Sequence, residues 1–139
     1  MPPHAPDDVV QDERIVVRWI DAINDGDVDG ALHCLDPAAT FHPLRLGVDG
    51  AYQGHDGVRR WFERLERQQR RHRIELAELR RTEHADLLAA GRLSYPDEPG
   101  ISPFCGMYRL AAGLIVMAHH YLSDADTVER ILGPATRRS

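Results

Sequence analysis

The stretch AINDGDVDGALHCLDPAATFHP, residues 22–43, holds the succession of elements that decides the fold. Apolar residues recur at helical spacing up to Ile23, and the NDG sequence that follows predicts the end of this first helix. Asp27 is placed to cap a second, shorter helix, which Asp36-Pro37 is expected to end. Thr40 to Leu44 then has the character of a short strand. The stretch therefore predicts helix, helix and strand in close succession.

Outward from this stretch, the chain changes from helical to alternating patterns. Gly47 to Gly54 is predicted to be a loop that contains Tyr52, and a third, amphipathic helix is expected to begin near Asp56. Strand character follows in four stretches, namely 72–82, 85–95, 102–111 and 114–122. This order predicts an α+β domain in which three helices cover one face of a curved, mostly antiparallel sheet.

Length and composition bound the organisation of the chain. Its 139 residues fit one domain, which we place at residues 9–132 between loose tails at 1–8 and 133–139. The composition, with 42% apolar and 28% charged residues, is that of a globular protein, and no apolar run reaches the length that a membrane span requires. The N-terminal sequence MPPHAPDDVVQDE lacks the pattern of a secretory signal, so we expect a cytoplasmic protein without membrane contact.

The charged and reactive residues exclude several function classes. All 17 basic residues are arginine, so the chain has no lysine for a P-loop or for a Schiff base. Seven arginines fall within residues 59–73, but glutamates at i,i+4 spacing and a net charge of -5 argue against nucleic-acid binding. Cys34 and Cys105 lack metal-type spacing, and we expect both to be buried free thiols.

Three motifs together resemble a known family. They are residues 22–43, the segment YQGHDGVRRWFERL at 52–65 and the segment GLIVMAHHYLSD at 113–124. In this order they are similar to the SnoaL-like polyketide cyclase and ketosteroid isomerase group of the nuclear transport factor two (NTF2-like) superfamily. The resemblance implies a cone-shaped domain with an apolar pocket between sheet and helices, commonly a dimer. It does not imply one reaction, because this fold hosts several chemistries and non-enzymatic modules.

The resemblance also suggests where a site would lie. His42 takes the place of the aspartate base of ketosteroid isomerases, Trp19 that of their oxyanion-hole tyrosine, and Gly106 that of their protonated aspartate. A histidine can exchange a proton at neutral pH, whereas the indole N–H can only donate a hydrogen bond and glycine offers no side chain. Steroid isomerisation by that mechanism is therefore not expected.

Strand alternation extends the set of candidates. With Gly106 facing the pocket, Phe104, Tyr108 and Leu110 face it too, while Cys105, Met107 and Arg109 face outward. On the last strand the family register turns Val116, Ala118, His120 and Leu122 inward and Ile115, Met117, His119 and Tyr121 outward. The predicted catalytic residues are His42, His120 and Tyr108. The predicted substrate-binding residues are Trp19, Trp61, Phe62, Phe104, Gly106, Ala118 and Leu122.

Two classes of function stay open. The first is acid–base catalysis without a cofactor or metal, in a cyclisation, isomerisation or dehydration of a small apolar substrate that carries a carbonyl or hydroxyl group. The second is a non-catalytic dimer that binds a ligand or a partner protein. Epoxide hydrolysis ranks below both, because its nearest carboxylates, Asp97, Glu98 and Asp124, lie at strand ends or turns. Acid–base catalysis is the preferred hypothesis.

The closing strand predicts the assembly. Leu114 to Ala118 is apolar at every position, and Met107 and Cys105 continue an outward apolar patch on the neighbouring strand. A sheet covered on one side only should alternate apolar with polar residues. We therefore expect a homodimer through the outer face of the sheet.

Overall fold

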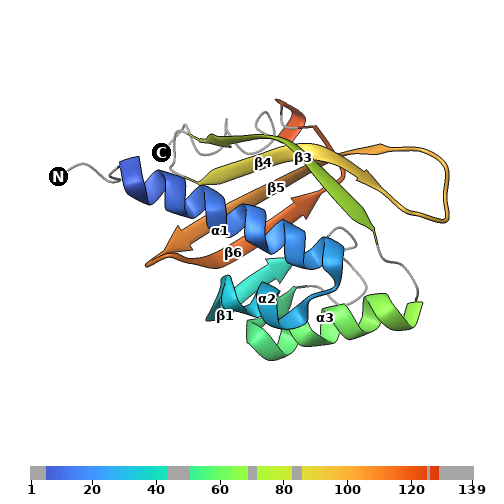
Figure 1. The fold of residues 1–139 in the computed structure, drawn as a ribbon, viewed down its shortest axis with the longest axis horizontal. Helices are drawn as coiled ribbons and strands as arrows, with labels where there is room; N and C mark the ends of the chain where they lie inside the picture. Colours follow the sequence, from blue (N-terminus) through green and yellow to red (C-terminus); the bar gives the residue numbers. More distant parts are fainter. Residues whose placement is uncertain (1–5, 44–50, 69–71, 83–85, 125, 129–139) are drawn as a thin grey trace.

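The computed structural model describes residues 6–43, 51–68, 72–82, 86–124 and 126–128, with side chains from residue 10 onward. Figure 1 shows the arrangement of its helices and strands. In chain order they are α1 (Pro6–Asp25), α2 (Val28–His33), β1 (Leu35–His42), β2 (Tyr52–Gln53), α3 (Gly54–Gln68), β3 (Arg73–Arg81), β4 (Leu87–Ser94), β5 (Ser102–Ala111) and β6 (Leu114–Tyr121). The expected α+β architecture is confirmed.

The strands form one curved sheet in the order β2-β1-β6-β5-β4-β3. β1 runs parallel to β6, and the other neighbours in the sheet are antiparallel. The turn between β5 and β6 is made by Ala112 and Gly113, which have φ angles of 54° and 78°. Two residues with positive φ suit a tight hairpin turn, because its twist then matches that of the strands.

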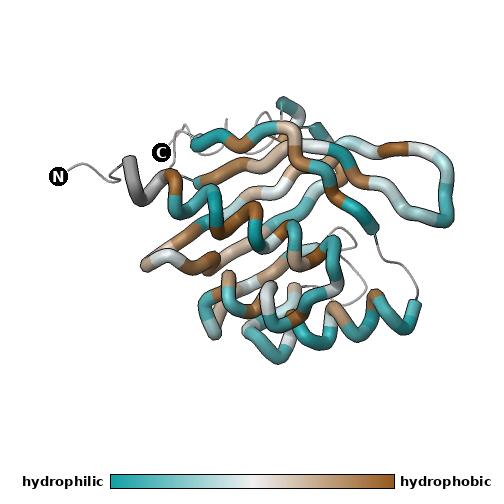
Figure 2. The backbone as a smooth tube through the Cα atoms, in the orientation of Figure 1, coloured by the Kyte–Doolittle hydropathy of each residue, from teal (hydrophilic) through white to brown (hydrophobic). Residues whose placement is uncertain are grey.

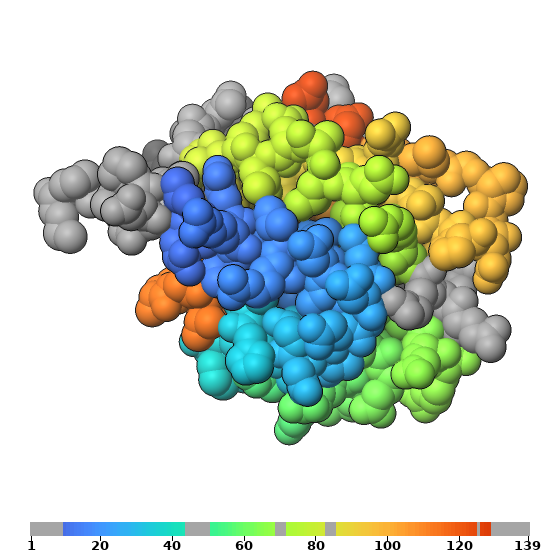
Figure 3. Space-filling model, in the orientation of Figure 1, coloured from blue at the N-terminus to red at the C-terminus, as the bar shows by residue number. Residues whose placement is uncertain are grey.

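The helices lie against one face of this sheet, which we call the inner face. α1 crosses the sheet, while α2 and α3 lie beside β1 (Figures 1 and 3). The apolar residues of α1 follow one stripe of the helix (Figure 2), and Val16, Trp19 and Ile20 on that stripe are almost completely buried. The side-chain amide of Asn24 donates to the carbonyl of Ile74 (2.9 Å) and accepts from its N–H (2.8 Å), which joins the end of α1 to edge strand β3.

The helix boundaries follow local chemistry, with two corrections. Asp27 caps α2 as expected, since its carboxylate accepts from the Gly30 N–H at 3.0 Å. However, α2 ends at His33, and Asp36 and Pro37 lie within β1. The ladder between β1 and β6 is interrupted between Leu35 and Thr40, so a proline there removes no hydrogen bond from it.

The second correction concerns the third helix. α3 begins at Gly54 rather than near Asp56, and Gly54 has a φ of 69°, a conformation that glycine adopts without strain. Tyr52 and Gln53, expected in a loop, form strand β2 beside β1. The remainder of that predicted loop lies among residues 44–50, outside the described residues, as does Leu44.

A bulge in β6 changes the expected facing of two residues. Arg109 pairs with Met117 but Leu110 pairs with Ile115, so the register shifts at Val116. Ile115 therefore faces the inner side and belongs to the core, whereas it was expected outward, and Val116 is not part of the core although it was expected inward. Beyond the bulge Ala118 and His120 face inward, as predicted.

The opposite, outer face carries a second apolar cluster. It consists of Leu88, Ala90, Cys105, Met107 and Val128, with Tyr121 packed against it. Val128 belongs to a helical turn after β6, so part of the outer face is covered by the chain itself. Cys105 and Met107, part of the patch from which a homodimer was predicted, are therefore already buried within the chain itself. A dimer stays a prediction for the remainder of this face, around Met117.

Of the two predicted tails, only the N-terminal one overlaps the residues that the structure describes. α1 already begins at Pro6, within the predicted N-terminal tail, while residues 1–5 and the predicted C-terminal tail lie outside the described residues. In the described part of the chain, no helix combines the length and apolar character needed to cross a membrane.

Candidate functional site

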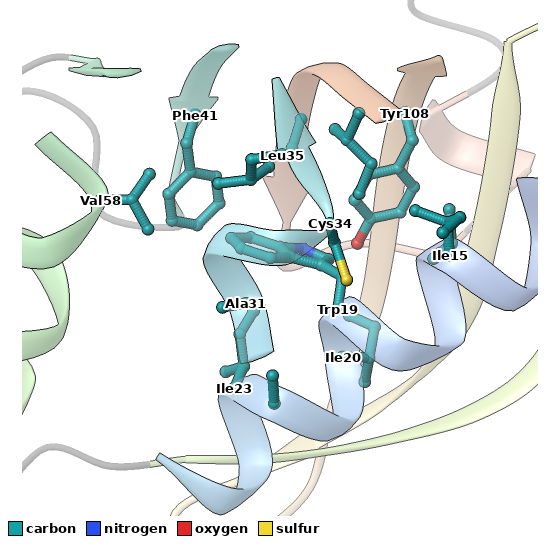
Figure 4. Packing of buried hydrophobic residues seen from close by; sticks show 14 of the residues in the cluster. Ile15, Trp19, Ile20, Ile23, Ala31, Cys34, Leu35, Phe41, Val58 and Tyr108 are labelled. Carbon is teal, nitrogen blue, oxygen red and sulfur yellow. The ribbon is translucent and has the colours of Figure 1, made fainter. Parts of the chain in front are cut away.

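Three polar side chains meet in the interior, between α1 and the centre of the sheet. The Tyr108 hydroxyl lies 2.8 Å from Nε2 of His120, and the indole Nε1 of Trp19 donates to the same nitrogen at 3.4 Å. Trp19 and Tyr108 have no solvent exposure and His120 has 3%. Figure 4 shows the Tyr108 ring reaching from the sheet toward Trp19 on α1. We call Trp19, Tyr108 and His120 the interior triad.

The hydrogen bonds fix the protonation of the triad. An indole nitrogen can only donate, so Nε2 of His120 is the acceptor and the imidazole carries its proton on Nδ1. The Tyr108 hydroxyl therefore also donates to Nε2. All three groups are neutral in this arrangement.

Burial keeps the triad neutral. The pKa of His120 is lowered to about 3, first by desolvation and then by the charges of His72 and His119. The pKa of Tyr108 is raised well above its ordinary value of 10.0, mainly by burial, with Cys105 adding to the rise and a hydrogen bond from Trp19 opposing it. Neither side chain is therefore charged near neutral pH in the resting protein.

Glycine at position 106 makes room for the Tyr108 side chain. A Cβ atom at Gly106 would lie 2.3 Å from the Tyr108 hydroxyl oxygen and 2.7 Å from two ring carbons. Gly106 and Tyr108 both face inward on β5, so the tyrosine ring lies back over the glycine. The position that the family resemblance matched to a protonated aspartate is thus filled by the hydroxyl of Tyr108.

Aromatic rings enclose His120. The Phe41 and Phe104 ring centroids each lie 5.0 Å from that of His120, in edge-to-face orientation. Phe41 in turn contacts Trp61 at 4.8 Å. These rings exclude water and strengthen the hydrogen bonds within the triad. Trp19, Trp61, Phe62 and Phe104, which were predicted to bind substrate, are all buried in the core, and their role in binding stays a prediction.

His42 does not lie beside His120, contrary to the prediction. Phe41 takes the inner face of β1, so alternation turns His42 to the outer face. There His42 stacks on His119, with ring centroids 3.9 Å apart and an interplanar angle of 25°. The pKa of His119 is lowered by partial burial, by His42 and by Arg109, with Asp86 opposing. Of the three predicted catalytic residues, the structure brings together only Tyr108 and His120.

Of the remaining predicted site residues, two lie on the inner face and one does not. Gly106 and Ala118 lie on the inner face, and their Cα positions pair with His120 and Tyr108 across β5 and β6. Leu122 is 49% exposed, because β6 ends at Tyr121 and the chain then turns away from the sheet. Leu122 is therefore not part of the interior site.

His72 is a buried residue near the site that was not among the predicted site residues. His72 is 7% exposed, and its ring lies 6.2 Å from that of Trp61 and 5.9 Å from that of Tyr95. The charge of His72 also contributes to the lowered pKa of His120. Its position two residues before the buried Ile74 of edge strand β3, and so on the same side of an extended chain, was the available signal. His4 and His84 lie outside the described residues.

No described carboxylate forms a hydrogen bond with the triad. Among the carboxylates that the structure describes, Asp12 alone is buried, and it pairs with Arg81 at 3.3 Å. Asp97, Glu98 and Asp124, named for epoxide hydrolysis, are all exposed. In the same part of the chain, no three His, Cys, Asp or Glu side chains are grouped closely enough to hold a metal ion.

The fold is shared with many solved structures. A putative polyketide cyclase from Sinorhizobium meliloti is 17% identical, with 77% of this chain and 93% of that chain covered and a TM-score of 0.64. An NTF2-like protein of unknown function from Burkholderia pseudomallei is 20% identical, with 88% and 98% covered and a TM-score of 0.66. SalBIII, described as an epoxide hydrolase/cyclase-like enzyme in pyran ring formation, is 17% identical, with 84% and 93% covered and a TM-score of 0.67. At these identities the likeness concerns the fold.

Comparison with sequence families is more specific. No curated protein matches the chain. The SnoaL-like domain matches residues 16–118, a span that runs from the middle of α1 to Ala118 on β6 and includes Trp19, Gly106 and Tyr108. The chain belongs to the family of SnoaL-like domains, on an NTF2-like fold.

Proposed function

We propose that this protein is a cofactor-free acid–base enzyme for a small apolar substrate that carries a carbonyl or hydroxyl group. The observation that carries the proposal is the 2.8 Å contact between the Tyr108 hydroxyl and His120 Nε2 inside an aromatic enclosure. Cyclisation, isomerisation and dehydration all need a proton taken from carbon or oxygen and a donor for the oxygen that gains charge. The pair supplies one group of each kind.

The chemistry follows from the hydrogen bonds of the triad. The Tyr108 hydroxyl turns from His120 to the substrate oxygen, and the longer contact from the Trp19 indole N–H must break as well, which together free the lone pair of Nε2. His120 then removes the proton next to the carbonyl, the C–H bond breaks, and its electrons move onto the oxygen as an enolate that Tyr108 stabilises. The imidazolium returns the proton to the product, so the protein is regenerated without an external reactant.

The low pKa of His120 limits which substrates react. A free protein with a pKa of about 3 at this histidine does not bind a proton from water at neutral pH. Proton uptake becomes favourable when an enolate forms beside the ring, because the two charges arise together in an apolar environment. Since Trp19, Phe41, Phe104 and Tyr108 have no solvent exposure, the substrate must also part these rings to reach Nε2.

Exchange of carbon-bound hydrogen tests the proposal before any natural substrate is known. The protein is incubated in D2O with a panel of small cyclic ketones, and loss of the α-proton signal is followed by NMR. We expect exchange above the protein-free rate with wild type, loss of that excess in His120→Gln, and a fall of about 10²-fold in Tyr108→Phe. His119→Gln, one position away on the outer face, is the matched control and should retain the wild-type rate.

A second function, ligand binding without catalysis, is favoured by one observation. The polar groups of the triad hydrogen-bond one another, so none of them points at a vacant position. If the protein binds its ligand without catalysis, ketones should shift the NMR signals of residues around His120, while the wild type should show no hydrogen exchange. Exchange that persists unchanged in His120→Gln would reject the acid–base assignment altogether.

A further inference from the structure

A cavity separate from the triad lies where the end of α1, the start of α2 and the second half of α3 meet. Its volume is about 160 Å³. It is lined by Ile23, Gly26, Val28, Phe62, Glu63, Leu65, Glu66 and His72. Apolar cavities of ~150 Å³ are large enough to bind benzene. The space therefore fits one small ring.

Aromatic side chains separate this cavity from the triad. His72 lines the cavity and packs on Trp61 with ring centroids 6.2 Å apart. Trp61 packs on Phe41, and Phe41 packs on His120, at 4.8 Å and 5.0 Å. A ligand in the cavity is thus three ring contacts from His120. It does not compete with a substrate at Nε2.

The cavity combines an apolar lining with an acidic rim. Ile23 and Phe62 are buried in the core, whereas Glu63 and Glu66 are exposed and lie three residues apart on α3. Neither glutamate forms an ion pair with the other described residues, although Arg67 is at i,i+4 from Glu63. Among the described residues that line the cavity there is no arginine. The rim therefore presents negative charge that other described side chains do not neutralise.

This arrangement selects a particular ligand chemistry. A ring in the cavity would be covered by Ile23, Val28 and Phe62, and a charged substituent would emerge beside Glu63 and Glu66. An ammonium group gains attraction there, a hydroxyl gains little, and a carboxylate is repelled. We propose that the cavity is a binding site for a small cyclic or aromatic amine, with its ring inside and its cation at the glutamates. This inference is independent of the proposed catalysis.

Three probes of equal size and different charge test the inference. Benzylamine, benzyl alcohol and benzoate are titrated into the full chain, and amide shifts are followed by two-dimensional NMR. We expect saturable shifts at Val28, Phe62 and Leu65 with benzylamine, weaker binding of benzyl alcohol and no binding of benzoate. Shifts at Met107, on the outer face, should not follow the titration.

Variants locate the binding. Glu63→Gln and Glu66→Gln should each lower the affinity for benzylamine by about two- to fivefold, which is the range of an exposed ion pair. Neither substitution should change the affinity for benzyl alcohol. Glu75→Gln removes the same charge from an exposed position on β3 and should change the affinity for neither probe. Val28→Phe should fill the cavity and abolish binding of both probes, and its thermal unfolding shows whether it remains folded.

Four results would each overturn the inference. The first three are the absence of saturable benzylamine shifts, equal affinities for benzylamine and benzoate, and undiminished binding to a folded Val28→Phe. A loss of affinity in Glu75→Gln equal to that in Glu63→Gln would also overturn it, because the attraction would then be that of the overall negative charge. Ketone exchange is not used as a readout, so failure here is distinguishable from failure of the proposed catalysis.

Discussion

His119 and His120 are neighbours on β6, but they lie on opposite faces of the sheet. His120 is enclosed by Phe41, Phe104 and Tyr108, and burial lowers its pKa to about 3. His119 is half-buried and stacks on His42, and its pKa falls by less, from the same kind of cause. The comparison teaches that the face of the sheet, more than the residue type, determines what a histidine can do here.

Removing each ring should give the largest difference between the faces. His120→Ala leaves a cavity and a buried Tyr108 hydroxyl without its acceptor, and we expect it to lower the free energy of unfolding by about 3 kcal/mol. His119→Ala removes a partly exposed ring and should cost roughly 0.5 kcal/mol. Urea unfolding of both variants measures the difference. Equal losses would show that the inner environment is not special.

Acid should reveal the same contrast. The pKa of His120 is about 3 in the folded protein and about 6.5 in the unfolded chain, so between these values the unfolded chain binds more protons. Stability is therefore lost as the pH falls through this window, by about 1.4 kcal/mol per pH unit from this group. Unfolding should be measured at pH 6.5 and 4.5 for wild type and His120→Gln, and the loss should be smaller in the variant. Identical slopes would mean that His120 is protonated in the folded state.

Gly106→Ala tests the packing that places the Tyr108 hydroxyl. The added methyl group would overlap the tyrosine side chain, and we expect a loss of about 2 kcal/mol. In a Tyr108→Ala background the same substitution should cost almost nothing, because the group it overlaps is absent. A double-mutant cycle by chemical unfolding gives the coupling energy. Additive costs would contradict the direct contact.

Two tyrosines provide a comparison with a smaller effect. Tyr108→Phe removes a buried donor from His120 and should cost about 1 kcal/mol. Tyr121 stacks on His119 at 6.1 Å on the outer face, and Tyr121→Phe should cost less than about 0.5 kcal/mol. Thermal unfolding of the pair is sufficient. A larger loss in Tyr121→Phe would place an unrecognised polar contact on the outer face.

The smallest effect on folding is expected at Met117. Because this side chain is only partly buried on the outer face, Met117→Glu should change the free energy of unfolding by about 0.5 kcal/mol or less. If a second copy covers this face, the same substitution should convert a dimer into a monomer in sedimentation at micromolar concentration. A monomeric wild type would refute the expected dimer.

Sequence patterns predicted the parts of the fold that obey simple periodicity. The stripe on α1 and the alternation of Phe104, Tyr108 and Leu110 on β5 identified the inner face correctly. The bulge at Val116 was not predictable, because it is defined by the pairing of β5 with β6 rather than by a residue type. The order of the strands in the sheet is likewise a property of long-range pairing.

The site was predicted in part for the same reasons. Tyr108 and His120 were found because alternation placed both inward. His42 was misplaced because the resemblance to ketosteroid isomerases does not determine which face of β1 it takes, and Ala39 and Phe41 occupy the inner face. His72 was missed because it lies at the boundary of the predicted strand 72–82, one residue before β3, where alternation alone does not determine which face a side chain takes. The contact between Trp19 and His120, which are 101 residues apart, could not be predicted from local patterns, because it depends on the three-dimensional fold.

That separation has a consequence for synthesis on the ribosome. In the described part of the chain β1 pairs with β2 and β6 alone. Until residue 121 has left the exit tunnel, β1 and β2 therefore cannot join the antiparallel strands β3, β4 and β5. Until then Trp19 and Phe41 lack His120, one of the groups that cover them in the folded protein. A nascent chain stalled before β6 therefore contains two unjoined parts of the sheet, each with exposed apolar surface. We expect such chains to be substrates for chaperones that bind exposed aromatic segments.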